Sequence, residues 1–524
     1  MAQHSDKDRQ QRLYVAAQGE KLRQGRISRR EFVRRCAIAG FGFSSFGLLQ
    51  ACGYTNAPTT GAAPTAAQIA ATAGPDTASV AQANNDTTKF LKDIGGKFKG
   101  TTLKIVSEST PPSRVIYEIS KQEFTPLTGI NVEWEQLPLD QVLSKVSQDT
   151  AGQLGSNDIY YFDQAWVGRF VNDVLSPTEL LQKKDLAYPN FNFDDFLKPL
   201  VDHICSFNGQ IIGLPYDIPI FIMMYRKDIF DKMKLTVPTT MQEYMDVVKA
   251  IDGEMKGQGV NGTVGQWKSG HYALQCDMTA WLWSHGGSHY TKDGKPSIND
   301  EKGLAGLNYM MELGKYMPSG ATTWDWSGQS DAFSQGKGGV MITWSEDFPG
   351  FDVPDKSKVA GQVMAAPLPK ELELRKPEDC GFGETPGIGH QGGSSICLSK
   401  YSKNQDAAWV FLQWATSPDL QIRASLLGGG DGMRQSTYDD PRVKAKSVAG
   451  PGTTRHFDVT LETIKTRMGT EPNQVPQWAD LSVNVTAIEL GKMTTGQQDV
   501  KTTADNMAKG LAVAAKAAKE SGLI

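Results

Sequence analysis

The sequence has few cysteines and none of the short motifs that hold nucleotides or mark common hydrolases. We find no G-x-S-x-G, P-loop or dinucleotide fingerprint between a strand and a helix. Six of the 524 residues are cysteines, and no CxxC pair occurs, which argues against a zinc or thioredoxin-like site. We therefore expect no cofactor and no metal. Four cysteines follow the first 52 residues, and three pairings of them stay open: Cys205, Cys276, Cys380 and Cys397.

Basic residues are also scarce outside the N-terminal segment. The chain has 54 Lys and Arg against 58 Asp and Glu, but residues 1–51 hold ten of the basic and four of the acidic ones. The remainder carries a net charge of about −10. This argues against a nucleic-acid partner, because phosphate binding depends on clustered basic residues. The length exceeds what one hydrophobic core usually organises, so we expect two lobes or domains.

The first 51 residues have the features of an export signal. A basic stretch, 21–35, precedes an apolar run, 36–49, that is too short to span a bilayer. Residues 28–34, Ser-Arg-Arg-Glu-Phe-Val-Arg, resemble the twin-arginine export motif, and Leu-Gln-Ala-Cys at 49–52 resembles a lipobox. This resemblance implies a lipidated Cys52 that anchors the protein at the periplasmic or cell-surface side of a membrane. The alternative is an ordinary signal peptide with an incidental cysteine.

Residues 52–88 are predicted to form a flexible tether. They are rich in Ala, Thr, Pro, Gly, Asn and Gln and contain one aromatic residue, so they cannot bury a core. As a coil they would reach roughly 30–35 Å. The folded domain is then expected over 89–524.

The start of that domain alternates strand and helix patterns. Strands are predicted at 102–106, 130–134 and 158–162, with helices at 114–127 and 140–154. This order is typical of a parallel sheet covered by helices.

The middle of the chain resembles the maltose-binding type of solute-binding protein, sugar-binding family 1. The most specific stretch reads Asn-Gly-Gln-Ile-Ile-Gly-Leu-Pro-Tyr-Asp at 208–217, followed by the apolar run 221–225, Arg-Lys-Asp-Ile-Phe at 226–230 and a Pro-Thr-Thr helix start at 238–240. Two positions depart from the family pattern, Asn157 for Pro and Gly339 for Ala. Further similar segments bring the resemblance from about residue 100 to the C-terminus: 156–175, 281–287, 292–295, 332–342, 392–396 and 407–414.

The resemblance implies an α/β, two-lobe periplasmic-binding-protein fold of type II. Each lobe would be a mostly parallel sheet flanked by helices, with hinge crossings between them. We expect lobe 1 at about 90–205 plus 350–400, lobe 2 at about 215–345, and C-terminal helices, 402–524, packing across both. The implied protein is not an enzyme but the monomeric substrate-binding component of an ABC importer, which delivers a sugar or polyol to permease subunits.

Candidate ligand contacts combine flat aromatic faces with polar groups at strand ends. A sugar presents apolar C–H faces and a rim of hydroxyls, so its site needs both kinds of side chain. Trp344, Glu346 and Asp347 directly follow a predicted strand, as do Asp163 and Trp166. From these contexts and from the resemblance we predict these binding residues: Glu108, Asp163, Trp166, Tyr216, Asp217, Trp267, His271, Trp344, Glu346, Asp347, Gly392, Arg434 and Trp478.

Two other functions stay open. The adjacent acids Glu346 and Asp347 could suggest an exported carbohydrate-active enzyme, although neighbouring residues rarely face each other across a glycosidic bond. Alternatively, the same binding role could serve a non-sugar polar or cationic solute, because the domain is acidic and loop tryptophans suit cations as well as sugars.

Overall fold

The computed structural model describes residues 77–520. The predicted signal peptide, the lipobox with Cys52 and the first part of the tether lie outside the described residues. Within the described part of the chain, no helix is both long and apolar enough to cross a membrane.

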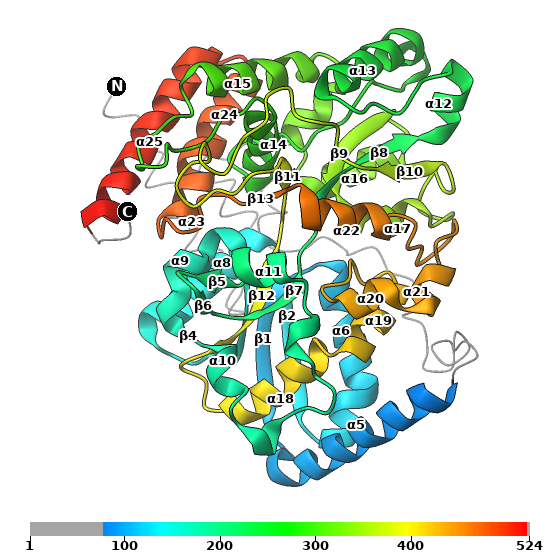
Figure 1. Cartoon of the computed structure of the whole chain (residues 1–524), viewed down its shortest axis with the longest axis vertical. Coiled ribbons are helices and arrows are strands. Elements are labelled where there is room, and N and C mark those ends of the chain that lie inside the picture. The colour runs from blue at the N-terminus through cyan, green and yellow to red at the C-terminus, as the bar shows by residue number, and fades with distance from the viewer. Residues whose placement is uncertain (1–76, 521–524) are drawn as a thin grey trace, which may run out of the picture. The chain divides into compact units, whose positions relative to one another are not determined.

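Two β-sheets form the centres of two lobes (Figure 1). The larger sheet has the order β2-β1-β3-β12-β4, with β7 also paired to β12, and we call the part of the molecule around it lobe 1. The smaller sheet, at the centre of lobe 2, has the order β10-β8-β9. The strands of lobe 1 are β1 (Thr102–Glu108), β2 (Asn131–Leu137), β3 (Ile159–Asp163), β4 (Val174–Leu175), β7 (Leu214–Asp217) and β12 (Ser394–Ser399). Those of lobe 2 are β8 (Phe221–Arg226), β9 (Val340–Trp344) and β10 (Val363–Ala366).

The predicted α/β class and two-lobe organisation are confirmed, but the sheets are less parallel than expected. In lobe 1, β1 is parallel to β2 and β3, whereas β12 is antiparallel to β3, β4 and β7. In lobe 2, β8 is antiparallel to both neighbours, β9 and β10. The expectation of a mostly parallel sheet is therefore wrong for lobe 2. Strand direction depends on the path of long connections, which residue patterns do not encode.

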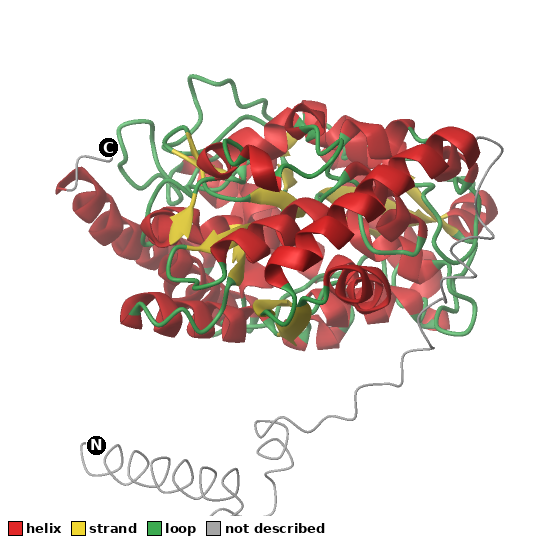
Figure 2. Cartoon of the chain, turned by 90° about the horizontal axis from the view of Figure 1, so that it is seen from below, coloured by secondary structure: helices red, strands yellow, loops and turns green. Residues whose placement is uncertain are grey.

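The number of buried residues in a strand depends on whether the strand lies inside the sheet or at its edge. All five residues of β3 are buried, because β3 lies between β1 and β12 and both of its faces are covered. By contrast, β2 lies at the sheet edge and buries Trp134 while it exposes alternate residues. Figure 2 shows helices surrounding the strands of the described body.

The chain crosses between the lobes directly after β7 and again before β12. Residues 218–220 lead from β7 into β8, and the second crossing lies against them, because Gly392 N–H donates to Pro219 O at 2.8 Å. We expected 350–400 to belong to lobe 1, but β10 pairs with β8 in lobe 2, so the return to lobe 1 comes only at β12. The short apolar β10 has no feature that assigns it to one sheet.

The helices cover both lobes, and the C-terminal ones divide between them. In lobe 1, α18 lies against β12, while α24 and α25 lie against α14 and α15 of lobe 2. Lobe 1 also contains α5 (Thr77–Phe98), α6 (Pro111–Ile119), α7 (Thr125–Thr128), α8 (Leu139–Gly152), α9 (Val167–Phe170), α10 (Pro177–Leu180) and α11 (Lys198–His203). Lobe 2 contains α12 (Lys227–Met233), α13 (Met241–Met255), α14 (Tyr272–Ser284), α15 (Glu301–Gly314), α16 (Trp326–Ser334) and α17 (Phe348–Phe351). The remaining helices are α18 (Gln405–Ala415), α19 (Pro418–Leu426), α20 (Gln435–Asp439), α21 (Pro441–Ala445), α22 (Phe457–Thr466), α23 (Trp478–Leu481), α24 (Ala487–Thr494) and α25 (Val500–Glu520), and short strands are β5 (Ser206–Phe207), β6 (Gln210–Ile211), β11 (Gly389–His390) and β13 (Met468–Gly469).

Residues 77–88, expected within the tether, instead form the first half of α5. The second half of α5 anchors the helix to lobe 1, because Leu91 and Ile94 are buried and Gly95 lies close to the backbone of Thr128. Ala and Gln in the first half are good helix formers and extend the helix once its other end is fixed. Composition alone does not show this docking.

The four cysteines among the described residues are all free and buried: Cys205, Cys276, Cys380 and Cys397.

Candidate functional site

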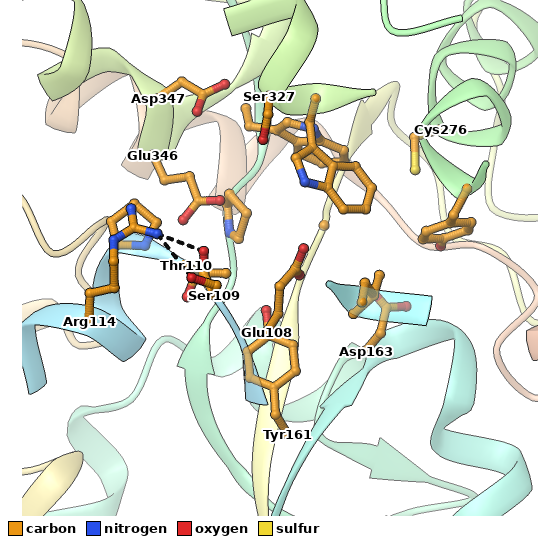
Figure 3. A pocket seen from close by; sticks show the side chains of 17 residues that line it. Glu108, Ser109, Thr110, Arg114, Tyr161, Asp163, Cys276, Ser327, Glu346 and Asp347 are labelled. Carbon is orange, nitrogen blue, oxygen red and sulfur yellow. Dashed lines mark hydrogen bonds between the residues drawn. The ribbon is translucent and has the colours of Figure 1, made fainter. Parts of the chain in front are cut away.

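A cavity of about 150 Å³ lies between the carboxyl ends of strands from both sheets (Figure 3). Lobe 1 contributes Glu108, Tyr161 and Asp163, and lobe 2 contributes Glu346 and Asp347 from the opposite side. The other lining residues are Ser109, Thr110, Pro111, Arg114, Leu139, Pro219, Tyr272, Cys276, Trp326, Ser327, Trp344 and Gly392.

The strand pairing of lobe 1 explains why its acids meet. Strands β1 and β3 are parallel neighbours, with Val106 opposite Tyr160, so their ends at Glu108 and Asp163 lie at the same sheet edge. Asp163 also caps the short helix that follows it, since its Oδ1 accepts from the Ala165 N–H at 2.8 Å. Its other carboxylate oxygen has no hydrogen bond to a described residue.

In lobe 2, strand β9 ends at Trp344, and the next turn carries the two acids. The indole Nε1–H of Trp344 donates to Gln266 Oε1 at 3.1 Å, and its ring lies 4.2 Å from that of Phe221, centroid to centroid. Gly392 allows the close approach of the indole, because an added Cβ would lie 2.7 Å from the ring atom Cζ3. Trp344 is thus fixed with its ring at the cavity wall.

The four acids of the cavity have raised pKa values. Burial, with repulsion from Asp217, raises the pKa of Glu108 well above its usual range, and burial does the same for Asp163. Burial and the neighbouring Asp217 and Asp347 raise the pKa of Glu346. Burial and Asp331 raise the pKa of Asp347 to about 7, although Arg114 opposes this shift. None of the four acids makes an ion pair with a described residue. Repulsion by Asp163 adds to the pKa shift of Glu108, and repulsion by Asp347 and Glu108 adds to that of Glu346.

Asp217 lies directly behind the cavity wall. The hydroxyl of Tyr161 donates to Asp217 Oδ2 at 3.2 Å, and this links a lining residue to the second layer. Burial raises the pKa of Asp217 to about 6, while hydrogen bonds from Thr110, Glu346 and Tyr161 limit the shift.

A second, wider space adjoins the cavity and shares Leu139, Tyr272 and Trp326 with it. Its volume is about 530 Å³. Two predicted site residues, Trp166 and His271, line this space and not the cavity. The ring of His271 lies 4.6 Å from that of Trp326, centroid to centroid.

The structure thus brings six of the thirteen predicted residues to the cavity wall: Glu108, Asp163, Trp344, Glu346, Asp347 and Gly392. Five others line neither space. Asp217 lies behind the wall, Tyr216 packs in the core against Trp134, and Trp267 donates its Nε1–H to Asp277. Arg434 and Trp478 also lie elsewhere, in buried polar networks.

Arg434 is held by the backbone and not by a cavity. Its guanidinium donates to Thr416 O and Asn192 O, both at 2.7 Å, and lies over the ring of Phe196. The expectation that Arg434 contacts the ligand is therefore wrong. The sequence around an arginine is the same whether its guanidinium binds a ligand or backbone carbonyl groups, so the pattern could not distinguish the two.

Trp478 is buried and donates its Nε1–H to Glu471 at 2.8 Å. Glu471 is fully buried and also accepts from the Tyr272 hydroxyl at 2.6 Å and from Gln164 Nε2 at 3.0 Å. Burial raises the pKa of Glu471, but His390 and the hydrogen bonds outweigh it and leave this pKa well below its usual range. The network joins Gln164 of lobe 1 to Tyr272 of lobe 2 beside the cavity.

Sequence reasoning missed Tyr161, Tyr272, Trp326 and Arg114. Tyr161 could have been found, because residues two apart in a strand share a face and Asp163 was predicted to face the ligand. By contrast, Tyr272, Trp326 and Arg114 lie on helices whose orientation toward the cavity is set by tertiary packing.

Comparison with known proteins now assigns the family. The model of the family described as bacterial extracellular solute-binding protein matches residues 120–449, more than half of the chain. The chain belongs to this family. Among curated relatives, the erythritol/L-threitol-binding protein of Mycolicibacterium smegmatis is 23% identical over 79% of this chain and 82% of its own length. A probable amino-acid ABC transporter periplasmic-binding protein of Sinorhizobium fredii is 24% identical over 66% of this chain and 75% of its own length.

Solved structures of other solute-binding proteins share the fold. A solute-binding protein of Agrobacterium radiobacter K84, in complex with ribitol, has a TM-score of 0.70 and 22% identity, over 79% of this chain and 99% of that one. A second, from Agrobacterium vitis S4 with bound D-mannitol, has a TM-score of 0.67 and 20% identity, over 81% and 99%. These solute-binding proteins therefore confirm the fold of this one.

Proposed function

We propose that this solute-binding protein is the substrate-binding component of an ABC importer for a small hydroxyl-rich solute, a monosaccharide or an acyclic polyol. The observation that carries the proposal is the small cavity between the lobes, which is lined by the indole of Trp344 and by four carboxyl groups. Relatives and structural neighbours that bind erythritol, mannitol and ribitol support this solute class.

The cavity volume supports a small solute over an oligosaccharide. Sites for drug-sized ligands enclose roughly 300–1,000 Å³, whereas this cavity encloses about 150 Å³. A longer solute would have to extend past Trp326 into the adjoining space.

Closure of the two lobes would signal to the permease that a solute is bound. Glu108 and Asp163 move with lobe 1, and Trp344 and Glu346 move with lobe 2, so a solute that contacts both sets stabilises the closed form. Only such differential affinity shifts a conformational equilibrium. The closed form is then the one that permease subunits recognise.

We further propose that the protein acts as a monomer, exported by the twin-arginine route and anchored through lipidated Cys52. The motif at 28–34 and the lipobox at 49–52 support this. In cells that express the full chain, Cys52→Ser should move the protein from the membrane fraction to the soluble fraction. Replacement of Arg29 and Arg30 by Lys should block export. Unchanged membrane association of the Cys52→Ser variant would refute the anchor.

A ligand panel tests the binding function against the enzyme alternative. The purified protein is melted with pentitols, hexitols, monosaccharides and maltose, and each mixture is then analysed for products by mass spectrometry. A raised melting temperature without product formation supports binding. Turnover of a glycoside that Glu346→Gln abolishes would instead show a carbohydrate-active enzyme.

A further inference from the structure

The charge of the cavity wall is strongly one-sided. Glu108, Asp163, Glu346 and Asp347 face the same space, and Arg114 is the single Lys or Arg among the lining residues. Arg114 already donates to Ser109 O at 2.7 Å and stands at one side of the space (Figure 3). None of the four acids forms an ion pair within residues 77–520.

Several of these carboxylate oxygens also lack hydrogen bonds. Glu346 Oε2 and Asp347 Oδ2 are buried and have no hydrogen-bond partner among the described residues. Asp163, 2% exposed, accepts one hydrogen bond, at Oδ1. A buried carboxylate without a partner is costly, and a hydrogen-bonded cation removes that cost. A neutral hydroxyl can donate a hydrogen bond to such an oxygen, but only a cation also stabilises the ionised carboxylate against the effect of burial.

The aromatic wall accepts the same kind of group. Trp344 and Trp326 both line the cavity, and an ammonium near an indole face is attracted by the ring quadrupole. An ammonium donates up to three hydrogen bonds, which matches carboxylates that converge from two lobes.

We propose that the solute carries an ammonium group held by these four carboxylates, so that the substrate class is an amine-bearing polyol or amino sugar. This inference rests on the proposed function and narrows it. A polyamine would share the ammonium chemistry but lack the hydroxyls that the remaining polar groups of the cavity can bind.

Matched ligand pairs test the inference by isothermal titration calorimetry at neutral pH. The pairs are sorbitol with glucamine and glucose with glucosamine, in which one hydroxyl becomes an amine, and putrescine represents a polyamine. We expect the amine of at least one pair to bind at least tenfold more tightly than its neutral partner. Glu346→Gln and Asp163→Asn, each nearly isosteric, should each reduce this preference at least threefold.

Glu179→Gln is the matched control, because it makes the same change of net charge at an exposed position on α10. It should leave the preference unchanged. If neither carboxylate variant folds, Asp347→Asn, which changes another carboxyl group of the cavity wall, should reduce the preference at least threefold.

Each other outcome is decisive. Neutral members that bind as tightly as their amines overturn the ammonium inference and leave the proposed function standing. Putrescine binding as tightly as glucamine, with no binding of sorbitol or glucose, overturns the hydroxyl-rich class and keeps the ammonium. No binding of any member of the panel overturns both.

Discussion

Asp347 should make the unliganded protein less stable as the pH rises through neutrality. Its pKa is raised to about 7 in the folded state by burial and by Asp331, whereas an unfolded Asp titrates near about 3.9. The folded state therefore binds a proton that the unfolded state has lost. This contribution to stability is fully present below the unfolded pKa and disappears as the pH rises through the folded pKa.

The magnitude follows from the linkage relation. Between about pH 6 and about pH 8, protonation of one group with a folded pKa near 7 changes the free energy of unfolding by about 1.4 kcal/mol. Asp277, buried beside Trp267, has its pKa raised to about 7 as well and contributes a similar amount. Asp347→Asn, which resembles the protonated acid in shape, should remove only its own share.

The assay is denaturant unfolding of the ligand-free protein at these two pH values. Wild type and the surface control Glu179→Gln should lose stability from the lower to the higher pH, and Asp347→Asn should lose about 1.4 kcal/mol less. The same loss in Asp347→Asn and in wild type would refute the assignment of a raised pKa to Asp347.

Three further outcomes are expected. In calorimetry, Trp344→Ala should weaken binding of the best panel ligand by about 2 kcal/mol, roughly 30-fold. The control Trp324→Ala, two residues before Trp326, should leave the affinity unchanged. Equal losses of affinity in the two variants would contradict a special role for Trp344. Glu471→Gln should lower the free energy of unfolding by about 3 kcal/mol, because it disrupts a buried charged network, and an unchanged unfolding midpoint would contradict this. The four free thiols should resist iodoacetamide in the native protein and react in urea without reductant, as followed by peptide mass spectrometry.

Much of lobe 1 could be predicted from local patterns. The strand predicted at 102–106 corresponds to β1, and that at 158–162 corresponds to β3, each within two residues at either end. Both strands are short apolar runs between turn-forming residues, and such runs can be recognised from the local sequence alone. The apolar run 221–225 likewise lies within β8.

Features that depend on distant partners could not be predicted in this way. Helix α5 forms over part of the expected tether because Leu91 and Ile94 dock on lobe 1. Trp478 and Trp344 were both predicted to contact the ligand, yet Trp478 binds the buried Glu471 while Trp344 lines the cavity. Glu471 is only seven residues from Trp478, but its other partners, Tyr272 and Gln164, come from distant parts of the chain, and local patterns do not show that these groups meet.

A crystal structure of the protein with the tightest-binding member of the ligand panel tests the central claim most directly. We predict that the solute lies in the cavity between the lobes, in contact with Trp344 and with at least one carboxylate from each lobe. A solute bound anywhere else, or held by residues of one lobe alone, would contradict the account.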